Sequence, residues 1–101
     1  MKVAWSPLAA EQVDAALAYI AADSPAAARE WLERLLERVE SLGRFPDAGR
    51  IVPEFQREDL REIIVGAYRV MYRRRDDLVE IAAIRHHARD VDQNEITSAN
   101  G

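Results

Sequence analysis

Two serine–proline pairs, at positions 6–7 and 24–25, constrain the fold of this chain more than any other feature. A serine before a helix caps it through its hydroxyl, and a proline at the first helical position costs no hydrogen bond because its missing N–H would be unpaired there. After each pair, apolar residues recur every three or four positions, which gathers them on one helix face. These residues are Leu8, Ala9, Val13, Ala16, Leu17 and Ile20, then Ala28, Trp31, Leu32, Leu35, Val39 and Leu42. We predict two amphipathic helices, one ending near Ala22 and one running from Pro25 to a cap at Gly43, joined as an antiparallel hairpin.

The segments before and after these helices are typical of β-strands. Residues 2–5 are short and apolar and predict an opening strand. Turn candidates at Gly66-Ala67 and Asp76-Asp77 separate the later strands, and residues 44–59 are predicted as a loop because prolines and glycine interrupt them. The later strands are predicted at Leu60–Val65, Tyr68–Arg74 and Leu78–His87. The order predicts an α+β fold with an antiparallel meander and one helix layer on one sheet face.

Length and composition narrow the class of protein. A chain of 101 residues has room for one domain, which we place at residues 1–89, followed by a polar acidic tail at residues 90–101. The absence of cysteine excludes a disulfide framework and a thiolate metal site. The longest apolar run, residues 15–22, is far shorter than a membrane helix, which needs about 20 residues. With no recognisable signal sequence before the first strand, we expect a cytoplasmic protein with no membrane partner.

Charge is unevenly distributed along the chain. The formal net charge is −4, yet residues 57–89 carry 8 Lys or Arg against 6 Asp or Glu, whereas residues 1–56 carry 6 against 9. The negative net charge argues against a protein that coats nucleic acid nonspecifically. Nearly all the cations are arginine, which binds carboxylate or phosphate through paired donors, although a general bias in composition would give the same count. The second half of the chain is therefore the candidate partner surface.

A series of short motifs runs through most of the chain. In order, they are Trp5-Ser6-Pro7 with Ala9, Tyr19-Ile20 with Asp23-Ser24-Pro25 and Ala28, Leu42 with Phe45-Pro46 and Gly49-Arg50, Val52-Pro53-Glu54, Arg61-Glu62, Gly66 with Tyr68-Arg69-Val70 and Tyr72, and His86 with Arg89-Asp90. With this order and spacing, the chain resembles the RelE/ParE toxin superfamily, and its ending resembles the ParE-like, or plasmid stabilisation, branch. The resemblance implies a helical hairpin packed on one face of a mixed, mostly antiparallel four-stranded sheet.

The resemblance also implies a function. Members of this superfamily are toxins of type II toxin–antitoxin systems, which arrest growth and are neutralised by a cognate antitoxin. Ribonuclease members cleave mRNA on the ribosome without a metal, and the matching candidates here are Arg61, Arg69, His86 and His87. Those members also use a terminal tyrosine or histidine, and no tyrosine follows Tyr72 in this chain. We therefore expect ParE-like inhibition of DNA gyrase without catalysis, metal or cofactor. The alternatives are a ribosome-dependent mRNA endoribonuclease and an inactive antitoxin-binding module.

Candidate contact residues follow from the same resemblance, from apolar grooves expected on the partly open domain and from the arginine-rich second half of the chain. We predict target contacts at Arg69, Arg85 and Arg89. Antitoxin contacts are predicted at Trp5, Leu17, Trp31 and Arg73. Each has a structural alternative: an arginine can pair with a neighbouring acid, the arginines beside Asp76-Asp77 can form a solvated turn, and a tryptophan at helical spacing can belong to the core.

Two questions of geometry stay open at this point. A two-residue turn at Gly66-Ala67 would place Arg61 and Arg69 on opposite faces of the sheet, whereas a shift of one residue in register would bring them together. His86 and His87 are adjacent in a predicted strand, so we expect them to point to opposite faces and not to form a metal site.

Overall fold

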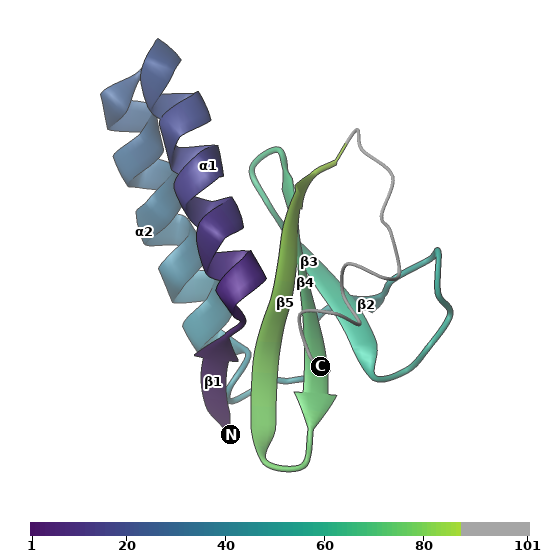
Figure 1. The fold of residues 1–101 in the computed structure, drawn as a ribbon. Coiled ribbons are helices and arrows are strands. Elements are labelled where there is room, and N and C mark those ends of the chain that lie inside the picture. Colours follow the sequence, from purple (N-terminus) through teal and green to yellow (C-terminus); the bar gives the residue numbers. More distant parts are fainter. Residues whose placement is uncertain (88–101) are drawn as a thin grey trace.

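A computed structural model describes residues 1–87 of the chain (Figure 1). The predicted acidic tail and Arg89 therefore lie outside the described residues. The elements are β1 (Lys2–Trp5), α1 (Pro7–Asp23), α2 (Pro25–Ser41), β2 (Arg50–Ile51), β3 (Leu60–Val65), β4 (Tyr68–Arg75) and β5 (Leu78–His86). Within residues 1–87, no helix is long and apolar enough to cross a membrane.

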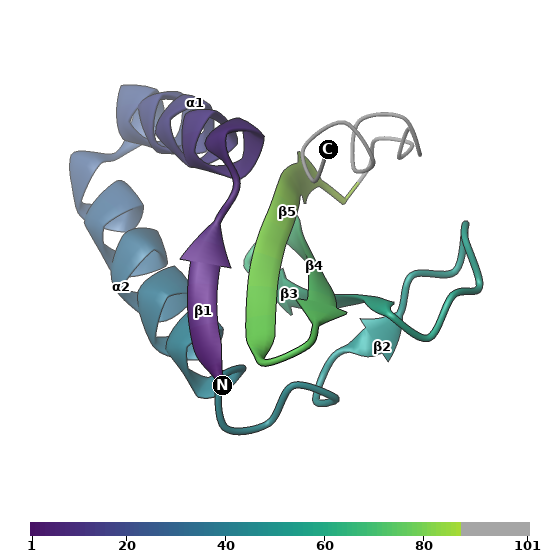
Figure 2. The same ribbon diagram turned by 60° about the horizontal axis from the view of Figure 1, so that its bottom comes forward.

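Both helices begin where the serine–proline pairs predict. The Ser6 hydroxyl accepts a hydrogen bond from the N–H of Ala9 at 3.0 Å, and the Ser24 hydroxyl accepts one from the N–H of Ala27 at 3.1 Å. The two helices pack against each other and cover one side of the sheet (Figure 2). The predicted helical hairpin is confirmed.

The predicted cap at Gly43 is wrong. Helix α2 ends at Ser41 with Leu42 as its C-cap, and Gly43 does not adopt the left-handed conformation of a glycine cap. A glycine is needed here because a Cβ would lie 2.6 Å from the Met1 carbonyl oxygen, and the Met1 ammonium donates to the Gly43 carbonyl at 2.7 Å. Gly43 therefore allows the chain start to pack against the end of α2.

The sheet has five strands in the order β1-β5-β4-β3-β2. Strand β1 runs parallel to β5, and the other pairs are antiparallel, so the sheet is mixed. The strand beyond the predicted four is β2, which lies inside the predicted loop. Two residues are too few to produce an alternating pattern, so only the pairing with β3 reveals this strand.

A bulge in the β4–β5 pair sets which residues of β5 face the helices. Tyr72 pairs with Ile81 and Met71 pairs with Ala83, which leaves Ala82 as the extra residue. As a result, Ile81 and Ile84 both enter the main core despite their odd spacing. The Ser6 hydroxyl donates to the Ala82 carbonyl at 3.0 Å, which links the start of α1 to the bulge.

A second, smaller core lies on the sheet face opposite the helices, which we name the open face. It consists of Val52, Leu60, Met71, Ala82 and Ala83, with Phe55 packed against them. The segment between β2 and β3 supplies two of these side chains and so covers part of the open face. The rest of that face carries the charged residues described next.

Candidate functional site

An ion cluster on the open face surrounds Arg69. Its Nε donates to Glu62 Oε1 at 2.7 Å, and its Nη1 and Nη2 donate to the two oxygens of Glu54 at 2.7 and 2.8 Å. The Arg69 side chain is only 7% exposed and that of Glu62 is fully buried. The hydrogen bond from Arg69 lowers the pKa of Glu54, and the same bond raises the pKa of Arg69. Glu54 and Arg69 are therefore charged and paired at neutral pH.

This geometry bears on the predicted role of Arg69. The guanidinium uses all three of its nitrogens on carboxylates of its own chain, which is the structural alternative left open by the sequence. A direct contact between Arg69 and a target stays a prediction, and it would require the cluster to open.

The register of β3 and β4 separates Arg61 from Arg69. Val65 pairs with Tyr68 across a two-residue turn, in which Gly66 has φ +61°, and Ile64 pairs with Arg69. Cross-strand partners share a sheet face, so Ile64 and Arg69 both lie on the open face. Arg61 is three residues from Ile64 along β3, and because side chains alternate between faces, it lies on the opposite, helix-covered face. There its Nη1 donates to the Gly49 carbonyl at 2.9 Å. The structure thus selects the arrangement in which the two arginines lie on opposite faces.

Tyr72 and Gly49 hold the loop before β2 against the sheet. The Tyr72 hydroxyl donates to the Pro46 carbonyl at 2.7 Å and accepts from the Gly49 N–H at 2.9 Å. Burial raises the pKa of Tyr72, so this hydroxyl stays protonated at neutral pH. A Cβ at Gly49 would lie 2.7 Å from the Tyr72 hydroxyl oxygen and 2.6 Å from the Glu62 carbonyl oxygen. These motif residues therefore fix the loop that leads into β2 and Arg50.

The two histidines lie close together at the end of β5. Their ring centroids are 4.8 Å apart, so the expectation that they point to opposite faces is wrong. The reason is that β5 ends at His86, and the His87 N–H instead donates to the Ala67 carbonyl at 2.8 Å. Within residues 1–87, no three His, Cys, Asp or Glu side chains are grouped so that they could hold a metal.

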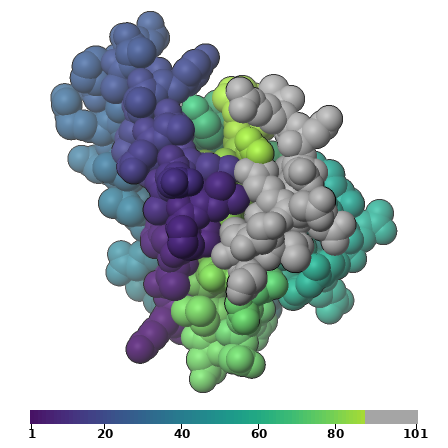
Figure 3. All heavy atoms as spheres, in the orientation of Figure 1, coloured from purple at the N-terminus to yellow at the C-terminus, as the bar shows by residue number. Residues whose placement is uncertain are grey.

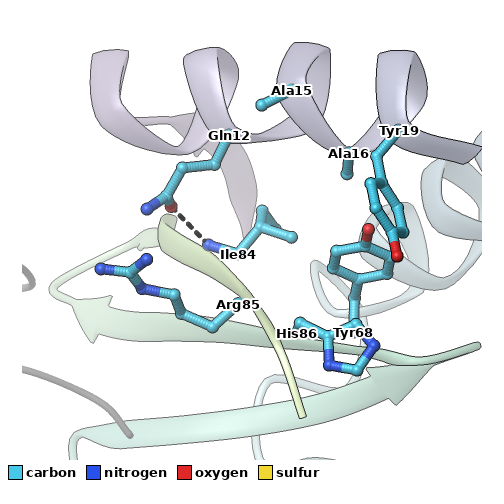
Figure 4. A pocket seen from close by; sticks show the side chains of 8 residues that line it. All are labelled: Gln12, Ala15, Ala16, Tyr19, Tyr68, Ile84, Arg85 and His86. Carbon is cyan, nitrogen blue, oxygen red and sulfur yellow. Dashed lines mark hydrogen bonds between the residues drawn. The ribbon is translucent and has the colours of Figure 1, made fainter. Parts of the chain in front are cut away.

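A groove opens between α1 and the end of β5, which lie side by side (Figure 3). Its volume is about 440 Å³, and Figure 4 shows its lining: Gln12, Ala15, Ala16, Tyr19, Tyr68, Ile84, Arg85 and His86. The Gln12 side-chain oxygen accepts from the Ile84 N–H at 2.7 Å. A second hollow of about 300 Å³ shares Tyr19, Tyr68 and His86 and extends toward Trp31. We call the two hollows together the Tyr19 groove.

Tyr19 is an exposed aromatic residue of this groove that was not among the predicted site residues. Its side chain is 73% exposed, the largest exposure of any bulky apolar or aromatic residue within residues 1–87. Ala15, Ala16 and Ala22 lie three or four positions from it in sequence, and an exposed tyrosine on this alanine-rich helix face was the available signal. The groove also contains Arg85, one of the predicted target contacts.

Comparison with known proteins gives the family. The family described as "ParE toxin of type II toxin-antitoxin system, parDE" matches residues 3–91. The chain belongs to the ParE toxin family. It is 35% identical over 88 residues to "Toxin RelE2" of Caulobacter vibrioides (strain ATCC 19089 / CIP 103742 / CB 15), a match that covers 87% of this chain and 97% of that protein. The structure "Chromosomal ParDE TA system from P. aeruginosa" matches with a TM-score of 0.69 at 20% identity, covering 85% of this chain and 95% of that one. The predicted α+β fold and the RelE/ParE resemblance are both confirmed.

The predicted antitoxin contacts of this ParE-family toxin lie in different environments. Trp31 is buried in the core, where its Nε1 donates to the Val65 carbonyl at 3.0 Å and its ring centroid lies 5.1 Å from that of Tyr68. Trp5 and Leu17 are half-buried at the margin of the main core. Arg73 lies 3.9 Å from Glu80 and is also largely buried. Trp5 and Leu17 are thus the two apolar positions of this set that keep accessible surface.

Proposed function

We propose that this toxin arrests growth by binding and inhibiting DNA gyrase in the cytoplasm, without a catalytic reaction of its own, and that a cognate antitoxin neutralises it. The observation that supports this most is that the ribonuclease candidates do not converge. Arg61 and Arg69 occupy opposite sheet faces, and each is already bonded to its own chain.

Metal-free cleavage of RNA needs a cation and a proton acceptor at the same phosphate. His86 pairs across the sheet with Tyr68, and its ring packs edge-on against the Tyr68 ring at 5.5 Å, which places it on the helix-covered face. The Arg69 guanidinium lies on the open face and is saturated by Glu54 and Glu62. The described residues therefore favour a binding mechanism over a catalytic one.

A binding mechanism needs an exposed contact surface, and the Tyr19 groove offers one. Tyrosine and arginine are the residue types that most often dominate protein–protein binding energy. In this proposal Tyr19 and Arg85 contact gyrase, and Arg69, which pairs with Arg85 across β4 and β5, holds the ion cluster together. Arg89 keeps its predicted role as a target contact but lies outside the described residues. The half-buried Trp5 and Leu17 are the apolar positions offered to the antitoxin.

Two assays with the same purified protein test the proposal. We expect gyrase to lose supercoiling activity in proportion to added toxin, while ribosome-bound mRNA stays intact. In cells, DNA damage signalling should rise before protein synthesis falls. Intact supercoiling together with cleaved mRNA would overturn the gyrase proposal.

The alternative function is ribosome-dependent cleavage of mRNA. It is supported by the 35% identity to a protein named Toxin RelE2. A third outcome, in which neither assay responds although a co-encoded antitoxin binds, would identify an inactive antitoxin-binding module.

A further inference from the structure

A buried carboxylate fixes one exposed arginine at the edge of the open face. Glu62 is fully buried, and its Oε1 is taken by Arg69. Its other oxygen, Oε2, accepts from Arg50 Nε at 2.6 Å and also contacts Arg50 Nη2. The Arg50 side chain is nevertheless 62% exposed. One edge of this guanidinium is therefore anchored, and Nη1 has no hydrogen-bond partner within residues 1–87.

The two arginines of this cluster thus differ in what they can still bind. Arg69 is enclosed by two carboxylates, whereas Arg50 shares one oxygen and presents its remaining donors to solvent. An arginine that is already immobilised loses little further side-chain entropy when it binds a ligand. Arg50 is therefore a preorganised site for an oxyanion.

An exposed apolar residue lies beside Arg50 on the same face. Arg50 pairs with Glu62, and Ile64 is two residues further along β3, so all three share the open face. The Ile64 side chain is 43% exposed. Strand β2 covers only the part of β3 that pairs with Arg50 and Ile51, and the Ile64 carbonyl accepts from Arg38 Nη1 at 3.2 Å. The edge of β3 next to Ile64 therefore has no strand alongside it within residues 1–87.

We propose that Arg50 and Ile64 form a docking site for an extended, acidic segment of the antitoxin. A carboxylate would bind the open side of Arg50, and an apolar side chain two residues away would cover Ile64, which matches the spacing of side chains on one strand face. A nucleic-acid phosphate fits less well, because the exposed Ile64 beside Arg50 favours an apolar contact that a nucleic-acid backbone does not supply. The proposal rests on the proposed antitoxin partner but is independent of which target the toxin inhibits.

Isothermal titration calorimetry tests this site by measuring the dissociation constant between this chain and the antitoxin encoded beside its gene. Arg50→Lys keeps a cation near Glu62 but removes the guanidinium N–H donors that face solvent. We therefore expect antitoxin binding to weaken about tenfold. Arg50→Glu should weaken it about a hundredfold or more, since like charges then face each other. Ile64→Ser should weaken it several-fold. Arg57→Glu is the matched control, because Arg57 is an exposed arginine that pairs with Asp59 and not with Glu62.

The outcomes separate the two proposals. Tight wild-type binding that Arg50→Lys and Ile64→Ser leave unchanged would overturn the docking site and leave the proposed toxin–antitoxin pairing intact. No binding by the wild-type chain would overturn both. Unchanged antitoxin binding with loss of gyrase inhibition would assign the surface to the target instead. Thermal melting of Arg50→Lys within a degree or two of the wild type, together with weakened binding, would support the site.

Discussion

The ion cluster of the open face and the Tyr19 groove differ in where their functional groups find partners. Arg69 and Glu62 are bonded to each other and largely withdrawn from solvent, and the partly exposed Glu54 is bonded to Arg69. Tyr19 is uncharged, yet it projects from α1 between two hollows at the end of β5. The ion cluster around Arg69 therefore stabilises the fold, whereas the uncharged Tyr19 is accessible to a partner.

This contrast shows why charge in a motif does not by itself mark a contact surface. Removing a charge from water is costly, so a buried charged group persists only where its own chain supplies partners. Deleting one partner then leaves the other uncompensated. An exposed aromatic residue beside a hollow loses little when it is deleted from the free protein, and its energetic role becomes visible only when a partner is bound.

The largest expected effect is the loss of stability on replacing Arg69. Arg69→Ala leaves Glu54 without its main partner and the buried Glu62 with Arg50 alone, and we expect it to lower the free energy of unfolding by about 3–5 kcal/mol. Trp31→Ala, which empties core volume, should cost about as much. Urea unfolding of both variants measures this. The control Arg57→Ala removes only an exposed pair and should cost about 0.2–1 kcal/mol.

A contact role for Arg69 predicts a different pattern. If the side chain met a target directly, Arg69→Ala would keep the wild-type unfolding midpoint and still bind antitoxin while losing growth arrest. That result would show that Arg69 contacts the target and does not mainly stabilise the fold.

The next effect is a loss of inhibition without a loss of stability. Tyr19→Ala should change the free energy of unfolding by less than about 0.5 kcal/mol, because the ring is exposed, yet it should weaken gyrase inhibition about thirtyfold, as expected for a central contact residue. Titrating gyrase supercoiling with the variant measures this. Leu36→Ala is the control, since Leu36 is 50% exposed on α2 and does not line either hollow of the groove. Equal inhibition by both variants would mean that the groove does not carry the target contact.

A smaller effect is expected on acidification. Arg69 lowers the pKa of Glu54 in the folded chain below its ordinary value of 4.5, so the carboxylate stabilises the fold at pH values above 4.5. That contribution disappears as the pH falls through the lowered folded pKa. Because Glu54 is partly exposed, we expect about 0.5–1 kcal/mol between wild type and Glu54→Gln at neutral pH, and this difference should disappear as the pH falls through the lowered pKa. Chemical unfolding at several pH values measures it, and a constant difference would show that this pair does not titrate with folding.

Much of the fold was predictable because its signals are local. Serine caps, proline at the first helical position and apolar periodicity predicted α1 and α2. Runs of β-branched and apolar residues predicted β3 and β5, the latter with one residue too many, and alternation predicted β4 except its last residue. The short strand β2, the bulge at Ala82 and the role of Gly43 depend on segments distant in sequence. No local pattern encodes these, since each arises only when two elements meet.

The site was less predictable for the same reason. The motifs singled out Arg61, Arg69 and Glu62, but only the register of β3 and β4 shows that the two arginines lie on opposite faces. Likewise, the anchoring of Arg50 depends on Glu62, twelve residues away. Tyr19 belongs to a matched motif, but its place between two hollows depends on how α1 packs against β5.

The smallest expected effect concerns the two histidines, and it tests most directly whether the groove binds or catalyses. General acid–base catalysis is worth about 10²–10⁴-fold, so a ribonuclease that used an imidazole would lose nearly all activity in the His86→Gln, His87→Gln double variant. A gyrase inhibitor needs no proton transfer, and glutamine keeps a polar group at the rim of the groove. We therefore expect the double variant to inhibit gyrase within about threefold of the wild type, a loss below 1 kcal/mol. Growth arrest in cells should persist to the same degree, and Tyr19→Ala serves as the inactive comparison. An inactive double variant with an active Tyr19→Ala would reverse the assignment, making the histidines the functional groups of the groove and favouring mRNA cleavage.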